Sequence, residues 1–121
     1  MESTAQSENV ASDRAKASDF AAALDLLWRR FLPEIRQRVE LLAAAAADCA
    51  ANQLSTAQCE AAHAAAHKLA GTLGTFNLAA GTELAREFEL QFAGGDTPDA
   101  RSAGRLASIA AELRAIVDSR K

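Results

Sequence analysis

His67 is the residue of this sequence whose surroundings most favour chemistry. It lies in the stretch AAHAAAHKLAGTLGTFN, residues 61–77. At about 100° per residue on an α-helix, the apolar side chains of this stretch gather on one side and His67 falls on the other. The stripe of His67 also contains Glu60, His63, Gly71 and Gly74. A glycine inside a helix costs about 1 kcal/mol relative to alanine, so two of them in an alanine-rich helix indicate that another molecule approaches the backbone there.

The run AHKLAGTLGTF resembles the signature of histidine-containing phosphotransfer (HPt) domains. That signature is a histidine followed by x-[LI]-x-G-[ST] and then a small-residue turn of helix leading to an aromatic residue. The resemblance is strong from about Ala61 to Glu89, and elsewhere it is only a matching pattern of helices. Two positions depart from it: Ala70 stands where many members have lysine, with Lys68 nearby instead, and Asn77 stands where glycine often follows the aromatic.

The resemblance implies a four-helix bundle whose exposed His67 is the phosphoacceptor. It would receive a phosphoryl group from a receiver-domain aspartate or a kinase relay and pass it on, so the expected partners are response regulator receiver domains and a sensor or hybrid histidine kinase. The positions expected to contact phosphate or partner are Lys68, Gly71, Gly74, His63, Ala64, Ala70 and Arg86. Two of these stay ambiguous, since Lys68 is as easily a solvated surface lysine and Arg86 lies on the next helix.

Histidine suits this chemistry because an exposed imidazole is largely uncharged near neutral pH, which leaves one ring nitrogen able to attack phosphorus. Phosphoryl transfer otherwise depends on positioning and on offsetting charge, usually with Mg²⁺. The sequence has no Walker-type loop, no nucleotide motif and no convincing inward carboxylate pair. We therefore expect a phosphoryl carrier without kinase activity and without a cofactor of its own, with the Mg²⁺ ion on the partner receiver domain.

Two alternatives compete with this interpretation. Glu60-x-x-His63 and His63-x-x-x-His67 are spacings that metal-binding bundles use, but a di-metal site needs a second Glu-x-x-His and the chain has only two histidines. These three side chains also project away from the apolar face, so no metal site is expected. The second alternative is a helical protein–protein adaptor that keeps the HPt-like fold and uses the same face without phosphotransfer.

Composition excludes other classes of protein. The net charge of −3 gives no electrostatic basis for nucleic-acid binding. No apolar run approaches the roughly 20 residues of a membrane span, and the N-terminus is polar and acidic, unlike a signal peptide. We therefore expect a cytoplasmic protein without membrane contact. Cys49 and Cys59 match no metal or redox spacing and are expected to be inert thiols.

The hydrophobic periodicity predicts an all-α fold, an antiparallel up-down four-helix bundle with an additional N-terminal helix. This helix either caps one end of the bundle or is continuous with the first bundle helix and kinked at Pro33. Residues 1–17 are expected to be a flexible tail, with helix near its end left open, and 18–121 to be the bundle domain, with Ser18–Asp19 expected to cap its first helix. A monomer is expected, with a dimer through the long first helix left open. The large side chains expected to form the core are Phe20, Leu24, Leu27, Trp28, Phe31, Ile35, Leu69, Phe76 and Phe88.

Overall fold

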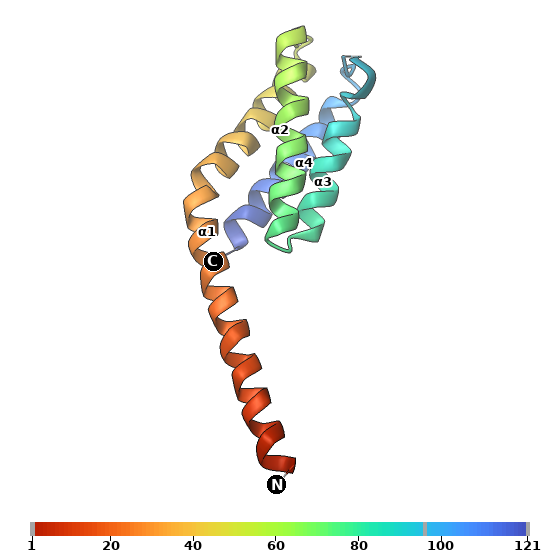
Figure 1. Ribbon diagram of the computed structural model, residues 1–121. Coiled ribbons are helices and arrows are strands. Elements are labelled where there is room, and N and C mark those ends of the chain that lie inside the picture. Colours follow the sequence, from red (N-terminus) through yellow and green to blue (C-terminus); the bar gives the residue numbers. More distant parts are fainter. Residues whose placement is uncertain (1, 96, 121) are drawn as a thin grey trace. The chain divides into compact units, whose positions relative to one another are not determined.

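A computed structural model describes the backbone of residues 2–95 and 97–120 and the side chains of residues 12–94 and 97–120. Over these residues the chain is helical, with no strand: α1 (Glu2–Ala50), α2 (Thr56–Thr75), α3 (Ala79–Leu90), the short 3₁₀ helix η1 (Ala93–Gly95) and α4 (Ala103–Ser119) (Figure 1). The chain divides into two compact units, Met1–Leu32 and Pro33–Lys121.

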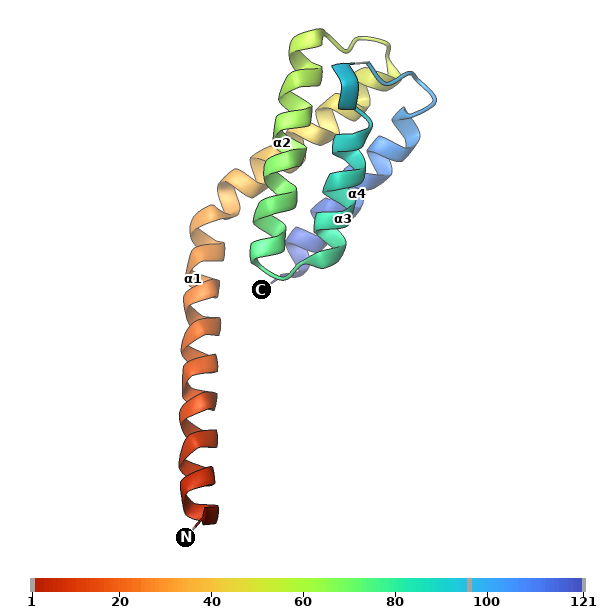
Figure 2. The ribbon, with the colours of Figure 1, turned by 45° about the vertical axis from the view of Figure 1, so that its right-hand side comes forward.

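The second unit is a four-helix bundle. Residues 33–50 of α1 and the helices α2, α3 and α4 run alternately in opposite directions and are joined by short connections (Figures 1 and 2). The predicted all-α bundle is therefore confirmed. Its interior is apolar, because the largest fully buried side chains are Phe88, Ile35, Leu42, Leu69, Leu73, Leu106, Ile109, Leu113, Val39 and Val117.

The first helix differs from the sequence-based expectation in where it begins. Pro33 lies inside α1, so the continuous helix is observed and the separate capping helix is not. The expected start at Ser18–Asp19 is also wrong, because α1 already includes Glu2. The division into a flexible tail, 1–17, and a bundle domain, 18–121, stays a prediction, and the side chains of residues 1–11 lie outside the described part.

A second correction concerns the apolar face of α1 before Pro33. Trp28 is buried, but Phe20 is 65% exposed, Leu27 41% and Phe31 40%. The expectation that these three residues form part of the core is therefore wrong. Their spacing identified an apolar face correctly, but spacing alone does not say what covers such a face.

The helix that bears His67, α2, begins at a capping box and is followed by a residue in the left-handed conformation. Ser55 and Gln58 form a capping box, with Gln58 N donating to Ser55 Oγ at 3.1 Å and Ser55 N donating to Gln58 Oε1 at 2.8 Å. At the other end Asn77 takes a φ of 59°, a left-handed conformation that asparagine tolerates, and Leu78 N donates to Leu73 O at 2.9 Å. Asn77 thus makes the turn into α3 in place of the glycine of the HPt signature.

Candidate functional site

His67 lies near the middle of α2 with its imidazole directed away from the core. The side chain is 73% exposed. The opposite face of α2 is buried as the periodicity predicts, through Ala62, Ala65, Ala66, Leu69, Leu73 and Phe76. The core therefore fixes which way α2 faces, and this orientation leaves His67 accessible to another molecule.

Glu89 of α3 holds one nitrogen of the His67 ring. The Nδ1 atom lies 3.0 Å from Glu89 Oε2 and 3.3 Å from Oε1. An ionised carboxylate only accepts hydrogen bonds, so in this contact Nδ1 carries the proton and donates it. In the neutral ring the lone pair is then on Nε2, which is the nitrogen left to react.

Packing of α3 places Glu89 beside the imidazole. Its neighbour Phe88 is fully buried and stacks on Phe92, with ring centroids 5.3 Å apart. Because Phe88 points into the core, the next residue on the helix emerges at the edge of α3 that faces α2. The core contact therefore sets the position of the carboxylate relative to His67.

His63 lies one turn before His67 and is oriented toward the same carboxylate. Its Nε2 atom is 3.8 Å from Glu89 Oε2, which is too long for a hydrogen bond and becomes an ion pair only when His63 is protonated. The structure thus brings both expected histidines to one glutamate. The contact made by Glu89 could not be predicted, because nothing in a single sequence indicates which surface residue of α3 lies beside a given residue of α2.

The two glycines after His67 differ in their surroundings. A Cβ atom added at Gly71 would meet nothing within 4 Å, whereas one at Gly74 would lie 3.4 Å from Thr82 Oγ1. Gly71 therefore borders open space on the His67 side of α2. Packing among the residues that the structure describes therefore does not require the absence of a side chain at Gly71.

The remaining expected contact positions differ in their exposure to solvent. Lys68 and Ala64 are exposed and line a groove of about 320 Å³ between α1 and α2. Arg86 is exposed on α3, three residues before Glu89. Ala70 is buried, and its carbonyl accepts a hydrogen bond from Thr82 Oγ1 at 3.0 Å, so its methyl group is not at the surface.

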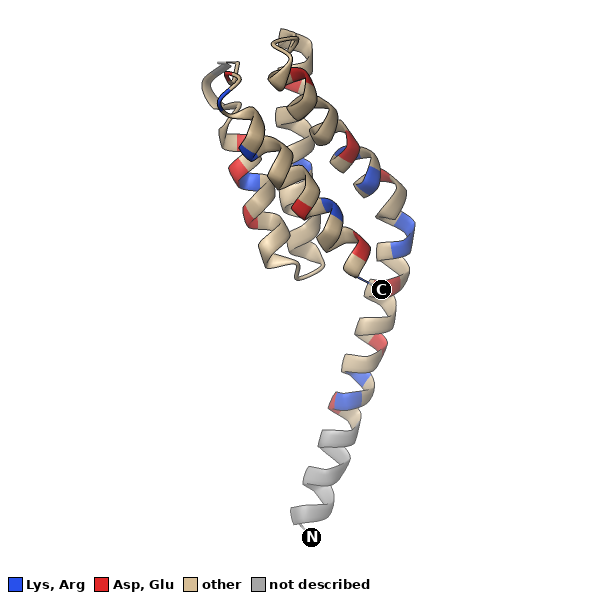
Figure 3. Ribbon diagram, turned by 180° about the vertical axis from the view of Figure 1, so that it is seen from behind, with Lys and Arg blue, Asp and Glu red and all other residues tan. Residues whose placement is uncertain are grey.

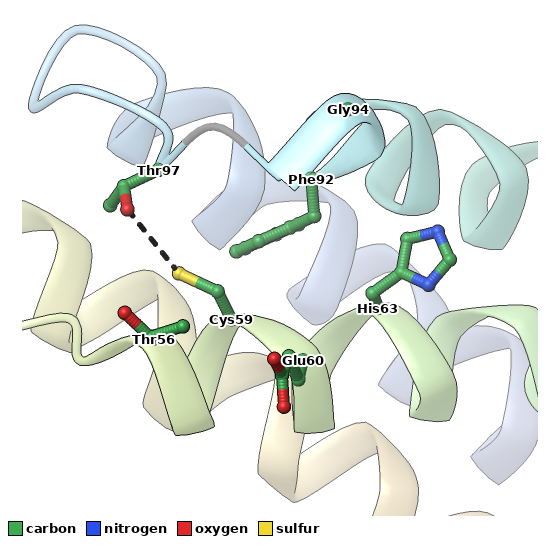
Figure 4. A pocket seen from close by; sticks show the side chains of 7 residues that line it. All are labelled: Thr56, Cys59, Glu60, His63, Phe92, Gly94 and Thr97. Carbon is green, nitrogen blue, oxygen red and sulfur yellow. Dashed lines mark hydrogen bonds between the residues drawn. The ribbon is translucent and has the colours of Figure 1, made fainter.

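A cavity of about 310 Å³ lies at the N-terminal end of α2, near His63 (Figure 4). Cys59 of α2 and Phe92, which follows α3, extend toward it from opposite sides (Figure 4). Among the residues with described side chains, no group of three or more His, Cys, Asp or Glu is placed to bind a metal ion.

The two cysteines are both free thiols. Cys49 is buried and donates to the carbonyl of Asp99 at 3.2 Å, which joins the end of α1 to the loop before α4. Burial, followed by the negative charge of Asp99, raises the pKa of the Cys49 thiol. Since the thiolate is the reactive form, this environment disfavours chemistry at Cys49.

The charged side chains of the described helices are mixed in sign (Figure 3). In the view of Figure 3, Lys and Arg are interspersed with Asp and Glu along the described helices, and neither sign dominates that face. None of the helices in the described part of the chain is long and apolar enough to cross a lipid bilayer.

Comparison with known proteins assigns this arrangement to a family. The model of the Hpt domain family matches residues 26–119, which is most of the chain. The chain belongs to the Hpt domain family, whose members are phosphotransfer carriers of phosphorelays and work with receiver domains and histidine kinases.

One curated relative is Protein RcaC of Microchaete diplosiphon. It is 30% identical over 99 residues, which are 82% of this chain. The chain spans only 15% of the length of RcaC. No solved structure matches the chain.

Proposed function

We propose that this chain is a histidine phosphotransfer module in which His67 accepts a phosphoryl group from a receiver-domain aspartate and donates it to another. The observation that supports this most is the state of the imidazole. The ring is 73% exposed, and Nδ1 lies 3.0 Å from Glu89 Oε2, so that Nε2 is the nitrogen left to react in the neutral ring. Membership of the Hpt domain family supports the same chemistry.

The proposed step needs no base. The Nε2 atom attacks the phosphorus of an aspartyl phosphate, the Nε2–P bond forms, and the P–O bond breaks with its electrons leaving on the aspartate carboxylate. The proton on Nδ1 stays where it is, so the phosphorylated ring is a cation. The Glu89 carboxylate at 3.0 Å offsets that charge, and donation to a second receiver is the same step in reverse.

The chain itself supplies few groups for the charge on the phosphoryl oxygens. We propose that the Mg²⁺ ion and most of the stabilising groups come from the acidic pocket of the receiver domain. Lys68 is exposed next to His67 in the sequence, and its long side chain makes it the local candidate for one phosphoryl oxygen. Gly71 and Gly74 leave room for the loops of the receiver to approach, while Ala64, His63 and Arg86 are candidate docking contacts.

The partners proposed are receiver domains of response regulators and a sensor or hybrid histidine kinase. A carrier must release each partner after transfer, so weak and short-lived binding suits this role. The chain would then work in the compartment of those partners, which we expect to be the cytoplasm.

The direct experiment is transfer from a phosphorylated receiver domain in the presence of Mg²⁺. We expect the wild-type chain to acquire acid-labile, base-stable label and the His67→Gln variant to acquire none. Because His67 is exposed, this variant should keep the thermal stability of the wild type, which circular dichroism can verify. A His63→Gln variant is the matched control, and we expect it to keep the label.

Two outcomes would contradict the proposal. If the His67→Gln variant still acquires label, another residue is the phosphoacceptor, and His63 is the next candidate. No label from any receiver domain of the host would favour the adaptor function, in which the same face binds partners without phosphotransfer.

A further inference from the structure

Four large apolar side chains lie along one side of α1 before Pro33, and we call them the FLLF stripe: Phe20, Leu24, Leu27 and Phe31. Phe20 is 65% exposed, Leu27 41% and Phe31 40%. A helix obtains most of its stability by packing an amphipathic face, and an exposed apolar patch of this kind marks an interaction surface. The stripe therefore lacks a partner among the described residues of its own unit.

The spacing of the stripe identifies the kind of partner. Steps of four, three and four residues follow the seam of a two-helix coiled coil, whose period is about 3.5 residues. The order of residue types, Phe-Leu-Leu-Phe, and the order of steps are also the same in both directions along the chain. A stripe with this symmetry is complementary to an antiparallel copy of itself.

The register of such a pair follows from the symmetry. With its centre between residues 25 and 26, Phe20 of one copy is level with Phe31 of the second copy, and Leu24 is level with Leu27. Leucines then meet at the middle and aromatic rings at both ends. Every member of the stripe contacts another large apolar side chain.

Charges beside the stripe fit the same arrangement. Asp19 and Arg30 lie on one flank, both roughly 90–110° from the centre of the stripe. In the antiparallel pair, the two-fold axis places this flank of one helix beside the same flank of the other. Arg30 then comes within about 3 Å, measured along the helix axis, of Asp19 of the second copy. A parallel pair would bring this flank against the one that carries Ala21 and Trp28 and would form no such ion pair. Neither Asp19 nor Arg30 has an ion pair among the residues the structure describes.

We propose that the FLLF stripe is a homodimer interface through which the α1 helices of two copies of this chain pair in antiparallel orientation. The sequence-based expectation was a monomer, with a dimer through the long first helix left open. The proposal favours that dimer. No residue of the candidate phosphotransfer site belongs to the stripe. The proposal therefore stands or falls independently of phosphotransfer.

The test is the molar mass of the full chain in solution, measured by light scattering and sedimentation over a concentration series. We expect a particle of twice 12.7 kDa at concentrations of about 100 μM. The key variant is Leu27→Gln, which places an amide in the seam and should raise the dimer Kd by about tenfold or more. The matched control is Leu26→Gln, because Leu26 is 65% exposed but lies about 130° from the stripe centre, and its Kd should stay unchanged.

The orientation is tested by exchanging charges. Asp19→Arg and Arg30→Asp should each weaken the dimer, and the double variant should recover most of the affinity because each chain again presents opposite charges to the other. Circular dichroism on each variant verifies that α1 remains helical. A monomer at all concentrations, or equal weakening by Leu26→Gln and Leu27→Gln, would overturn the proposal and assign the stripe to a different occupant. A dimer in which the double charge exchange gives no recovery would overturn the antiparallel arrangement.

Discussion

The contact between His67 and Glu89 matters because the charge on the imidazole changes during transfer. In the free chain the carboxylate lies 3.0 Å from Nδ1, where it favours a proton on that atom, and the His67 side chain is 73% exposed. In the proposed phosphorylated state the ring is a cation, so the same contact becomes an ion pair. Glu89 should therefore act as a positioning residue that stabilises the phosphorylated form more than the free one.

Substitution of Glu89 tests this role. We expect Glu89→Ala to lower the rate of transfer to His67 by about tenfold and to shorten the lifetime of the phosphohistidine, because hydrogen bonds to charged groups are worth about 1.5–3 kcal/mol when buried and less when solvent-exposed. Glu89→Gln keeps an acceptor oxygen without the charge and should lie between the alanine variant and the wild type. Stopped-flow or quenched-flow transfer assays measure the rates. Equal rates in all three proteins would show that Glu89 has no part in transfer.

His67 and Glu89 also show which residues of the site can be predicted from a single sequence. His67 could be predicted because its exposure follows from the helical period of its own segment, and local spacing is visible in the sequence. Glu89 could not, because its contact with His67 depends on how α3 rotates against α2. That rotation is set by Phe88 in the core, and periodicity gives the buried face without giving the neighbour at its edge.

At the scale of the helix, three glycines that look alike in the sequence have different roles. An added Cβ atom would meet nothing within 4 Å at Gly71 and would lie 3.4 Å from Thr82 Oγ1 at Gly74. At Gly81 of α3 it would lie 2.8 Å from Leu73 Cδ1. Leu73 is fully buried, so its side chain would have to shift within the core to admit that atom. Gly81 is therefore a packing residue between α2 and α3, a role that the helical period of α3 alone does not reveal.

Paired substitutions separate these roles. Gly71→Ala should raise the free energy of unfolding by about 1 kcal/mol through helix propensity, whereas Gly81→Ala should lower it by about 1–3 kcal/mol through overpacking. Chemical denaturation measures both. Gly71→Gln should also keep or raise stability while slowing transfer, because its side chain obstructs the approach of a receiver. Unchanged transfer kinetics in Gly71→Gln would show that the open backbone serves another purpose.

The helices themselves were largely predictable. The capping box at Ser55, the turn at Asn77 and the buried face of α4 all follow from local signals, and the structure has them. The N-terminal half of α1 was predicted less well, because its apolar face implied a core position that Phe20 and Phe31 do not have. A period identifies a face that needs a partner, and the partner need not belong to the same chain.

At the scale of the whole bundle, surface ion pairs join α4 to its neighbours. Arg105 binds Glu87 of α3 through two hydrogen bonds, one of 2.7 Å from Nη2, and Arg114 binds Glu40 of α1 at 2.6 Å. The hydrogen bonds from Arg105 hold the pKa of Glu87 below its ordinary value of 4.5. All these side chains are well exposed, so solvent screening keeps their contribution small.

The lowered pKa of Glu87 gives a prediction for pH. A carboxyl group whose pKa is lower in the folded state stabilises the fold above its ordinary pKa, and that stabilisation is lost as the pH falls through the lowered value. Glu87→Gln should therefore be slightly less stable than the wild type at pH 7, and the difference should shrink as the pH falls below 4.5 and vanish once the pH is below the lowered pKa of Glu87. Thermal melts of both proteins across pH 3–7 measure it. If the variant is still less stable than the wild type at pH 3, the loss of stability comes from altered packing and not from the charge of Glu87.

The most direct measurement of the central claim is NMR of the chain with ¹⁵N-labelled histidine before and after incubation with a phosphorylated receiver domain. Since the chain contains only two histidines, long-range ¹H–¹⁵N and ³¹P spectra assign the acceptor atom without ambiguity. We expect a proton on Nδ1 of His67 in the free chain and a single phosphoryl group on its Nε2 atom afterwards. A phosphoryl group on Nδ1 of His67 or on His63, or a chain that stays unmodified with every receiver domain of its host, would contradict the account.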